Sequence, residues 1–359
     1  MKTVGIMSMQ RIINYGSFLQ AYALKEMIRN ETGSDVQFVD YNIEKEVFLQ
    51  SNKRTILEKI RNNQTIVNYI KKKFFLHRLN YSLINNLKAI GVDEKNYNKN
   101  LDVLVIGSDE VFNCLQAYPV GYSRELFGYG FETIKVISYA ASFGFTEISD
   151  LKNKLIDKEI ADMLFNFSAL SVRDYNSYSI INELTGMKPL IHVDPVLAYD
   201  FDFNYVINEH NYILLYFYTG RLKKVEESFI KKFAKKHHKK ILSVGNYSAI
   251  ADKNIICDPI NVFSYFKNAD YVITDTFHGT IFSIKTNSKF CTIIRKSNYN
   301  KLSYLLEEMG QSDRIVFNLE DIDYLFKQEI DYTNTNKKIA EESRRTREYL
   351  RLEIGHGYE

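Results

Sequence analysis

Two short polar segments, far apart in the sequence, each lie between an apolar run and a segment with helical apolar spacing. Ile13–Ser17 follows the run Thr3–Met9, and Thr274–Thr280 follows Tyr271–Ile273. We predict that each segment is a turn between a buried strand and a helix. Such a turn presents unpaired helix amides, which suit an anionic ligand. The pairing indicates a two-domain α/β protein with its site in the cleft between the domains.

His278, in the second turn, is the residue best suited to acid–base chemistry. An imidazole titrates near neutral pH, and Asp275, Thr276 and Thr280 are its polar neighbours in sequence. The alternative is a histidine that only caps or packs the helix. We predict that His278 faces the cleft and exchanges a proton there.

Arg173 ends the predicted strand Ala169–Val172, which places a permanent positive charge at the carboxyl edge of the first sheet. A guanidinium can bind a carboxylate or a phosphate through two parallel hydrogen bonds. The alternative is an ion pair with Asp174 or Asp194, and the residues alone leave both interpretations open.

Small residues follow two further predicted strands. Gly107–Asp109 follows Leu101–Ile106, and Ala140–Gly144 ends another strand, so a ligand could approach either backbone closely. Tight turns would need the same residues. The sequence contains no GxGxxG, no GxxxxGK[ST] and no metal-type carboxylate cluster, so it supports neither a nucleotide cofactor nor a metal.

The elements that must position these residues alternate between strand and helix. This alternation predicts mainly parallel sheets with helices on both faces, in two facing Rossmann-like domains. We expect an N-terminal domain over 1–198 with a basic helical insert at about 43–100, a C-terminal domain over 205–330, and a helix within 331–359. We expect this last helix to pack back on the first domain. The predicted strands are Thr3–Met9, Val36–Tyr41, Leu101–Ser108, Val136–Phe143, Ala169–Arg173, Leu190–Val196, Tyr212–Tyr218, Ile241–Val244, Tyr271–Thr274 and Phe290–Ile294.

Composition and charge exclude several classes of protein. The formal net charge of +3 is too small to imply nucleic-acid binding. Cys114, Cys257 and Cys291 have no CxxC spacing, so neither a disulfide framework nor a zinc site is indicated. No apolar run reaches the length of a membrane-spanning helix, and we expect a cytoplasmic protein.

The segment Lys53–Arg78 is strongly basic. It carries Lys53, Arg54, Lys59, Arg61, Lys71, Lys72, Lys73 and Arg78 against Glu58 alone, an excess of +7. Apolar residues interleave with these charges, which predicts an amphipathic basic helix. A solvated helical face is one interpretation; contact with an anionic substrate, or peripheral contact with the anionic inner face of a membrane, is the other.

Taken in order, six blocks of this sequence resemble the polysaccharide pyruvyl transferase family. They are Asn14–Ser17 with Leu19–Leu24, Gly107–Asn113, Ser138–Gly144, Ser171–Asp174, His192–Val196 and Ala269–Thr280. The resemblance implies a fold like the GT-B glycosyltransferases. It also implies transfer of a pyruvyl group from phosphoenolpyruvate to a sugar as a cyclic ketal, in the synthesis of capsules, cell-wall polymers or exopolysaccharides.

The resemblance also implies the site. His278 and Arg173 match the family's acid/base or donor-contact histidine and its arginine. No metal or organic cofactor is implied, and the partner is a sugar acceptor, glycan or lipid-linked. The expected substrate-binding residues are Asn14, Tyr15, Gly16, Ser17, Gly107, Ser108, Asp109, Asn113, Ser142, Asp275, Thr276, Gly279, Thr280 and Arg295.

One position departs from the family pattern. Many members have Arg-Leu-His where this sequence has Thr276–His278, so a positive charge is missing two residues before the histidine. Arg295, Lys285 or Arg314 could supply it, or the donor could be a different one. A glycosyltransferase that uses a nucleotide sugar and a non-catalytic glycan-binding protein are the alternative functions on the same fold.

Overall fold

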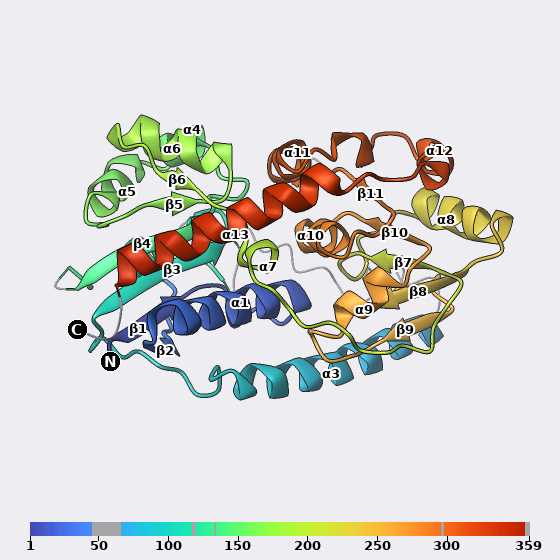
Figure 1. Cartoon of the computed structure of the whole chain (residues 1–359), viewed down its shortest axis with the longest axis horizontal. Helices are drawn as coiled ribbons and strands as arrows, with labels where there is room; N and C mark the ends of the chain where they lie inside the picture. Colours follow the sequence, from blue (N-terminus) through green and yellow to red (C-terminus); the bar gives the residue numbers. More distant parts are fainter. Residues whose placement is uncertain (45–65, 117–119, 133, 296–297, 356–359) are drawn as a thin grey trace.

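The computed structural model describes residues 1–44, 66–116, 120–132, 134–295 and 298–355. Its strands form two parallel six-stranded sheets, one in each half of the molecule (Figure 1). The first sheet, in spatial order, contains β2 (Asp35–Phe38), β1 (Thr3–Met7), β3 (Val103–Asp109), β4 (Lys135–Ala141), β5 (Ser171–Val172) and β6 (Leu190–Ile191). The second contains β12 (Ile315–Val316), β11 (Phe290–Ile293), β10 (Tyr271–Thr274), β7 (Tyr212–Tyr216), β8 (Lys240–Val244) and β9 (Lys253–Ile255). The predicted α/β fold with two Rossmann-like halves is confirmed.

Both sheets reverse their strand order at one point. In the second sheet the reversal lies between β7 and β10, which gives the usual dinucleotide-fold order. In the first it lies between β1 and β3. Met7 pairs with Ile106 and Thr274 with Tyr216, so the chain leaves both strands of each pair at the same edge. Each sheet therefore opens a crevice where its strands end.

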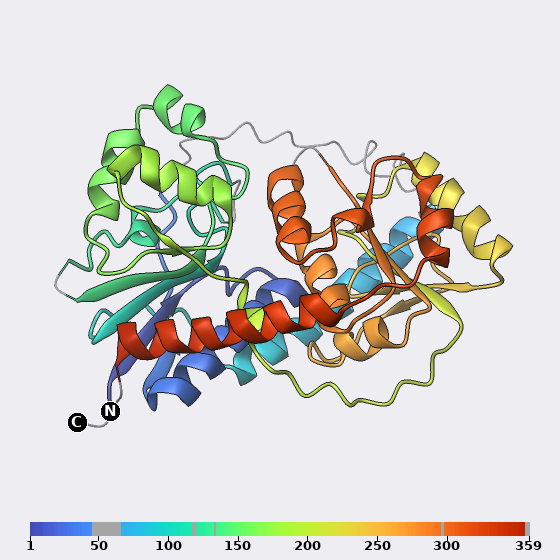
Figure 2. The same ribbon diagram turned by 45° about the horizontal axis from the view of Figure 1, so that its top comes forward.

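Helices cover both sheets and join them. In the first half these are α1 (Tyr15–Thr32), α3 (Ile66–Ala89), the 3₁₀ turn η1 (Arg124–Phe127), α4 (Ile148–Asn153), α5 (Asp157–Leu164), α6 (Tyr175–Thr185) and α7 (Pro195–Ala198). In the second they are α8 (Lys224–Lys236), α9 (Val262–Lys267), α10 (Phe277–Lys285), α11 (Tyr299–Glu308), the 3₁₀ turn η3 (Ser312–Arg314) and α12 (Asp321–Lys327). The final helix, α13 (Thr333–Ile354), runs from the second half back across the first (Figure 2).

Helix α13 packs on the first domain, as the sequence predicted. Tyr349 Oη donates to Ser138 O at 2.7 Å, and Ser343 Oγ donates to Ala198 O. At its other end, Thr335 Oγ1 donates to Met309 O in the second domain at 2.9 Å. Buried residues of α1, α7, α10 and α13 belong to one apolar cluster that reaches both sheets. This cluster holds the two domains together, because separating them would expose it to water.

Some predicted elements differ from the structure in detail. The two edge strands β9 and β12 were not predicted, because each is only two or three residues long and has no distinct alternation. The predicted strand Leu190–Val196 ends at Ile191, where Asp194 caps the short helix α7 through the Val196 amide. Within the described residues, no helix is both long and apolar enough to cross a membrane.

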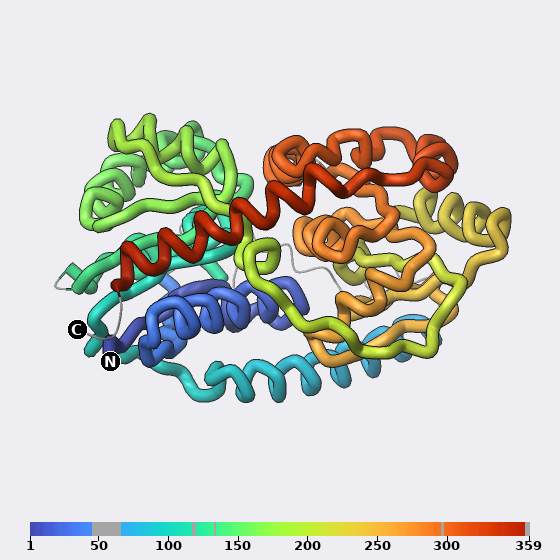
Figure 3. The backbone as a smooth tube through the Cα atoms, viewed as in Figure 1, coloured from blue at the N-terminus to red at the C-terminus, as the bar shows by residue number. Residues whose placement is uncertain are grey.

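The basic segment falls partly outside the described residues. Its first four basic residues and Glu58 lie in 45–65, and its remaining basic residues lie on α3. The tube view shows α3 passing along one side of the molecule from the first domain to the second (Figure 3). The ring of Phe75 on α3 lies 5.9 Å from that of Tyr247 in the second domain.

Candidate functional site

The two turns identified in the sequence become the starts of α1 and α10. Asn14 caps α1 by accepting a hydrogen bond from Ser17 N at 2.8 Å. Thr276 caps α10 in the same way, accepting from Gly279 N at 2.9 Å. Ser, Thr and Asn are favoured at such positions because the side-chain oxygen satisfies an otherwise unpaired amide.

Gly16 and His278 bring these two helix starts into contact. A Cβ atom at position 16 would lie 2.3 Å from both Cγ and Nδ1 of the His278 ring. Only glycine leaves room for the imidazole on this turn, since carbon atoms in contact need about 3.5 Å. The first domain thus forms part of the wall against which His278 is held.

His278 is buried and faces a carboxylate. Its Nε2 atom lies 3.8 Å from Asp194 Oδ2 and has no hydrogen-bond partner within the described residues. Burial lowers the pKa of His278, although the charges of Asp194 and Asp109 oppose this shift. The lowered pKa favours the neutral ring, which has one nitrogen available for a proton.

Arg173 is also buried and pairs with two carboxylates. Its Nη1 donates to Asp194 Oδ2 at 2.8 Å, and its Nη2 donates to Asp109 Oδ1 at 3.3 Å. The guanidinium carbon lies 4.2 Å from the centre of the Phe277 ring, close enough for a cation–π interaction. Of the two interpretations that the sequence left open, the ion pair with Asp194 is present in the structure.

Glu110 and Lys301 form an ion pair across the domain boundary. Burial opposes ionisation of Glu110, but the Lys301 ammonium outweighs it and lowers the pKa of Glu110 to about 2. Lys301 was not predicted as a site residue. Its neighbours in sequence do not distinguish this lysine, in the first turn of α11, from an ordinary lysine exposed to solvent. Glu110 lies within the Gly107–Asn113 block, which was the only available signal.

A cavity of about 220 Å³ lies where the crevices of the two sheets meet. After β1 and β3 the chain contributes Met9, Ile12, Asn14, Ser17, Asp109, Glu110 and Gln116. After β7 and β10 it contributes Tyr218, Phe277 and His278, and α11 adds Lys301. Such a crevice is where open α/β sheets usually bind ligands. We call this cavity the cleft.

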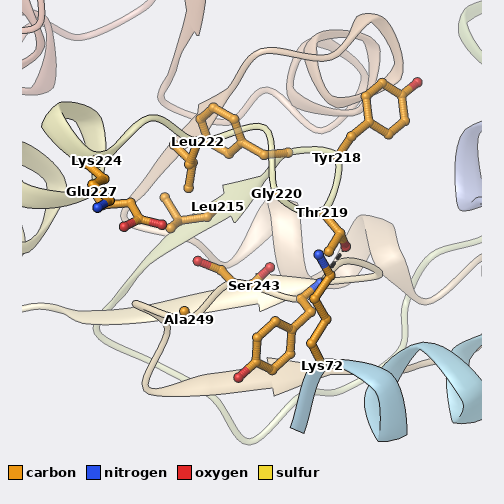
Figure 4. A pocket seen from close by; sticks show the side chains of 13 residues that line it. Lys72, Leu215, Tyr218, Thr219, Gly220, Leu222, Lys224, Glu227, Ser243 and Ala249 are labelled. Atoms are coloured by element: carbon orange, nitrogen blue, oxygen red, sulfur yellow. Dashed lines mark hydrogen bonds between the residues drawn. The ribbon is translucent and has the colours of Figure 1, made fainter. Parts of the chain in front are cut away.

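Two further hollows border the cleft. One, of about 260 Å³, contains Arg173, Asp194, Phe277 and Lys301 and is closed by α13. The other, of about 90 Å³, lies at the ends of β7 and β8. Figure 4 shows Lys72 extending into it from α3 toward Thr219 and Gly220. Tyr218 lines both this hollow and the cleft.

Several other predicted site residues lie behind the cleft. Ser108 Oγ donates to Gln20 Oε1 on α1 at 2.6 Å, and Ser142 Oγ donates to Asp174 Oδ2. Both serines are fully buried. Thr280 Oγ1 donates to Thr276 O at 3.0 Å within α10. These residues stabilise the turns in this structure rather than line the cleft.

The three cations considered as replacements for the missing arginine lie elsewhere. Arg295 pairs with Glu226 and Asp275, and its Nε donates to Asp275 Oδ2 at 2.9 Å. Lys285, at the far end of α10, donates to Leu197 O at 2.8 Å. Arg314 pairs with its neighbour Asp313. Among the residues that the structure describes, the cation that lines the cleft is Lys301.

No group of three or more histidine, cysteine, aspartate or glutamate side chains that could hold a metal occurs in the described part of the chain. The cleft instead combines the His278 imidazole, the Lys301–Glu110 ion pair, the Asp109 carboxylate and the starts of two helices. Such a set can move a proton and hold an anion.

Comparisons with known proteins agree with this architecture. The model of the polysaccharide pyruvyl transferase family matches residues 14–297. The fold is similar to S. aureus MnaA in complex with UDP (TM-score 0.55, 10% identity, covering 100% of this chain and 98% of that one). It is also similar to Neisseria meningitidis UDP-GlcNAc 2-epimerase bound to UDP-GlcNAc (TM-score 0.52, 7% identity, 99% of each chain). A third similar structure is the Streptomyces sp. SF2575 glycosyltransferase SsfS6 with thymidine diphosphate (TM-score 0.51, 10% identity, 98% and 99%).

At these identities the structural likeness establishes the fold alone. It confirms the GT-B-like arrangement of two facing domains. Among curated proteins, none matches the sequence.

Proposed function

Because the chain belongs to the polysaccharide pyruvyl transferase family, we propose that it transfers a pyruvyl group from phosphoenolpyruvate to a sugar. The acceptor is a surface polysaccharide or its lipid-linked precursor. Two hydroxyls of one sugar become joined through the pyruvyl carbon as a cyclic ketal, and phosphate is released. The reaction takes place in the cytoplasm and uses no metal or organic cofactor.

The transfer requires four proton movements that balance. The enol CH₂ carbon gains one proton and becomes a methyl group. The neighbouring carbon then carries positive charge, and one sugar hydroxyl attacks it and loses its proton. The bond from that carbon to the phosphate oxygen breaks, and the departing phosphate takes up a proton. The second hydroxyl closes the ketal and loses the last proton.

His278 is the residue we assign to these proton transfers. The observation that carries the proposal is its buried, unpartnered Nε2 in the cleft, 3.8 Å from Asp194. Its lowered pKa leaves the ring unprotonated in the free protein, so that it can accept a proton. The negative charge of phosphoenolpyruvate would raise that pKa, so the same ring could then hold the proton that the enol carbon receives.

Lys301 is the residue we assign to the donor's carboxylate or phosphate. It lines the cleft, and its partner Glu110 comes from the opposite domain. An anionic donor would compete with Glu110 for the ammonium, and the amides at the start of α1 offer a second contact. Arg173 acts as a positioning residue, because it holds Asp194 and Phe277 beside His278.

The acceptor enters, in this proposal, from the hollow shown in Figure 4. Tyr218 lies between that hollow and the cleft, and Thr219, Ser243 and Glu227 provide polar groups. An aromatic ring beside hydroxyl and carboxyl groups is a suitable surface for a saccharide, which has both apolar and polar faces.

The test is to incubate the purified protein with phosphoenolpyruvate and a panel of nucleotide-linked and lipid-linked sugars. We expect phosphate release together with a mass gain equal to one pyruvyl ketal on one acceptor. The His278→Ala variant is the negative control. Release of a nucleotide from a nucleotide sugar would instead indicate a glycosyltransferase. Tight sugar binding without turnover of any donor would indicate a glycan-binding protein.

A further inference from the structure

Helix α3 is apolar on two opposite faces. On its inner face Phe75, Leu79, Leu83 and Leu87 are buried. On its outer face six large apolar residues are between 40% and 68% exposed: Ile66, Val67, Ile70, Phe74, Tyr81 and Ile84. A surface helix normally needs only the inner stripe, which packs on the protein core.

The outer residues form one stripe. Ile66, Ile70 and Phe74 are four residues apart, and Tyr81 and Ile84 continue the row at intervals of seven and three residues. At about 100° per residue, these positions fall on the side of the helix opposite Phe75 and Leu79. Exposed apolar residues that occur singly are ordinary, but a continuous stripe indicates a binding surface.

Basic residues accompany this stripe, and acidic residues do not. The helix carries Lys71, Lys72, Lys73, Arg78 and Lys88, and it contains no aspartate or glutamate. Lys71 and Lys73 are exposed, and the Arg78 guanidinium lies 5.8 Å from the Phe74 ring centre. Apolar side chains bordered by lysine and arginine are typical of helices that lie in the plane of an anionic membrane surface.

We propose that the outer face of α3 docks on an anionic lipid bilayer. Ile66, Ile70, Phe74 and Tyr81 enter the boundary between head groups and acyl chains, and Lys71, Lys73 and Arg78 contact the anionic head groups. A lipid surface suits this face better than an acidic protein would, because the charges border an apolar stripe instead of forming a separate patch. The helix lies on the membrane and does not span it.

The same helix borders, on its inner side, the hollow that adjoins the cleft. Lys72 points inward to the hollow of Figure 4, and Tyr218 separates that hollow from the cleft. Docking through the outer face would therefore bring that hollow near the bilayer. A lipid-linked acceptor would be found there if the proposed function holds, but docking itself depends only on α3.

Flotation with vesicles tests the proposal without any assay of activity. The whole protein is mixed with vesicles of phosphatidylcholine alone, or with 30% phosphatidylglycerol, at low and at high salt. We expect flotation only with the anionic vesicles, and its loss in high salt, because head-group attraction is screened beyond a Debye length of about 8 Å at physiological ionic strength. Absence of binding to anionic vesicles at low salt would overturn the proposal.

Matched variants distinguish vesicle binding through the outer face of α3 from nonspecific binding of the protein to vesicles. Lys71→Gln with Lys73→Gln should weaken binding roughly 30-fold, since each surface cation contributes about fivefold. Ile70→Ser with Phe74→Ser should also weaken it. The controls are Lys232→Gln with Lys235→Gln on exposed positions of α8, and Phe317→Ser at an exposed aromatic residue. Equal binding by outer-face and control variants would overturn the proposal.

Sedimentation distinguishes the other occupant of this face, a second copy of the chain. A dimer that dissociates in the Ile70→Ser, Phe74→Ser variant, with no vesicle binding, would assign the stripe to self-association and overturn membrane docking. Thermal unfolding should be unchanged in all variants, because the altered side chains are exposed.

Discussion

The starts of α1 and α10 are built alike but do different work. Each has a capping side chain, then an aromatic residue, Tyr15 in α1 and Phe277 in α10. Each aromatic side chain reaches the opposite domain: Tyr15 Oη donates to Cys257 O at 2.8 Å, and Phe277 lies on Arg173. The next residue is Gly16 in α1 and His278 in α10, and these two are in contact.

The two helix starts differ in the roles we propose for them. The start of α1 supports the site, and the start of α10 carries the residue assigned to proton transfer. In α1 the aromatic residue makes two hydrogen bonds, because Tyr15 Oη also accepts from Cys257 N at 2.9 Å, and glycine leaves space. In α10 the corresponding space is filled by an imidazole whose Nε2 has no hydrogen-bond partner among the described residues. In the proposed mechanism one domain therefore supplies a fixed wall, and the other supplies the imidazole that exchanges protons against it.

Removal of the imidazole should have the largest effect. His278→Ala is expected to lower turnover by roughly 10²–10⁴-fold, as is usual when general acid–base catalysis is lost. The protein should stay folded, because the substitution only shortens one side chain at the contact between two helix starts and introduces no clash. Steady-state phosphate release gives the rate, and His210→Gln, at an exposed histidine, is the matched control. Near-normal turnover by the folded variant would remove His278 from the mechanism.

Filling the space at position 16 should be the next largest change. In Gly16→Ala the new Cβ would lie 2.3 Å from the His278 ring, so the ring must move. We expect a loss of activity of about 10²-fold from misplacement and of about 1–3 kcal/mol in the free energy of unfolding from overpacking.

A double variant shows whether the ring is the cause. Adding His278→Ala to Gly16→Ala should restore most of the lost stability, since the clash disappears. If the double variant is as unstable as the sum of the single ones, the strain at position 16 arises elsewhere.

A substitution at Arg173 tests the role of the guanidinium that contacts Phe277, the aromatic residue of α10. Arg173→Lys keeps the charge but loses the fork that contacts Asp194 and Asp109. If Arg173 is a positioning residue, Arg173→Lys should lower kcat by roughly tenfold with little change in the KM for phosphoenolpyruvate. A raised KM with unchanged kcat would instead show that Arg173 binds the donor, as the sequence suggested.

Tyr15→Phe should have a smaller effect than any change in α10. It removes the hydroxyl that bridges Cys257 N and O. Those two backbone groups would then have to form hydrogen bonds with water or remain without a partner. Urea unfolding should show a loss of about 1–2 kcal/mol. Turnover should fall by less than about threefold, because support is only loosened. The exposed Tyr175→Phe is the control, and a catalytic loss as large as that of His278→Ala would contradict the division of roles.

Lowering the pH should produce the smallest of these effects. It should reduce the stability of the protein through His278, at the start of α10. Burial lowers the pKa of His278 below 6.5, so the unfolded chain binds more protons than the folded one as the pH falls. Stability from this group is complete above about pH 6.5 and is lost as the pH falls below it. The wild type should therefore lose more stability between pH 7 and 5 than His278→Gln does.

His192 contributes to the same acid loss in both proteins. Burial and the charge of Arg345 lower its pKa to about 4, but this contribution cancels in the difference between wild type and His278→Gln. An identical pH dependence of stability in the two proteins would mean that His278 titrates normally.

The sequence allowed prediction of ten of the twelve described strands, the two turns and the position of His278 at the cleft, because these depend on local patterns. Apolar runs mark the strands, and capping residues mark the helix starts. The contact between Gly16 and His278 could not be predicted, since it joins positions 262 residues apart in the sequence. Lys301 escaped notice for the same reason: only its partner Glu110, in the other domain, distinguishes it.

Burial also changed how predicted residues are interpreted. Ser108 lies near the end of β3 and Ser142 directly follows β4, and a sequence pattern cannot tell which side of the turn their hydroxyls face. In the structure these hydroxyls bond to Gln20 and Asp174 behind the turns. Which side chains face a ligand depends on the packing of helices that are distant in sequence.

The return of α13 to the first domain makes the second domain an insertion in the first. The chain leaves the first domain after α7 and comes back in α13, where Lys2 Nζ donates to Ile354 O at 2.6 Å. A circular permutant that joins these neighbouring ends and opens within 202–210 would keep the packing of both domains. A fragment that stops at residue 198 would lack Tyr349, Leu350 and Ile354 from its core, so the two halves of this molecule are not separable modules.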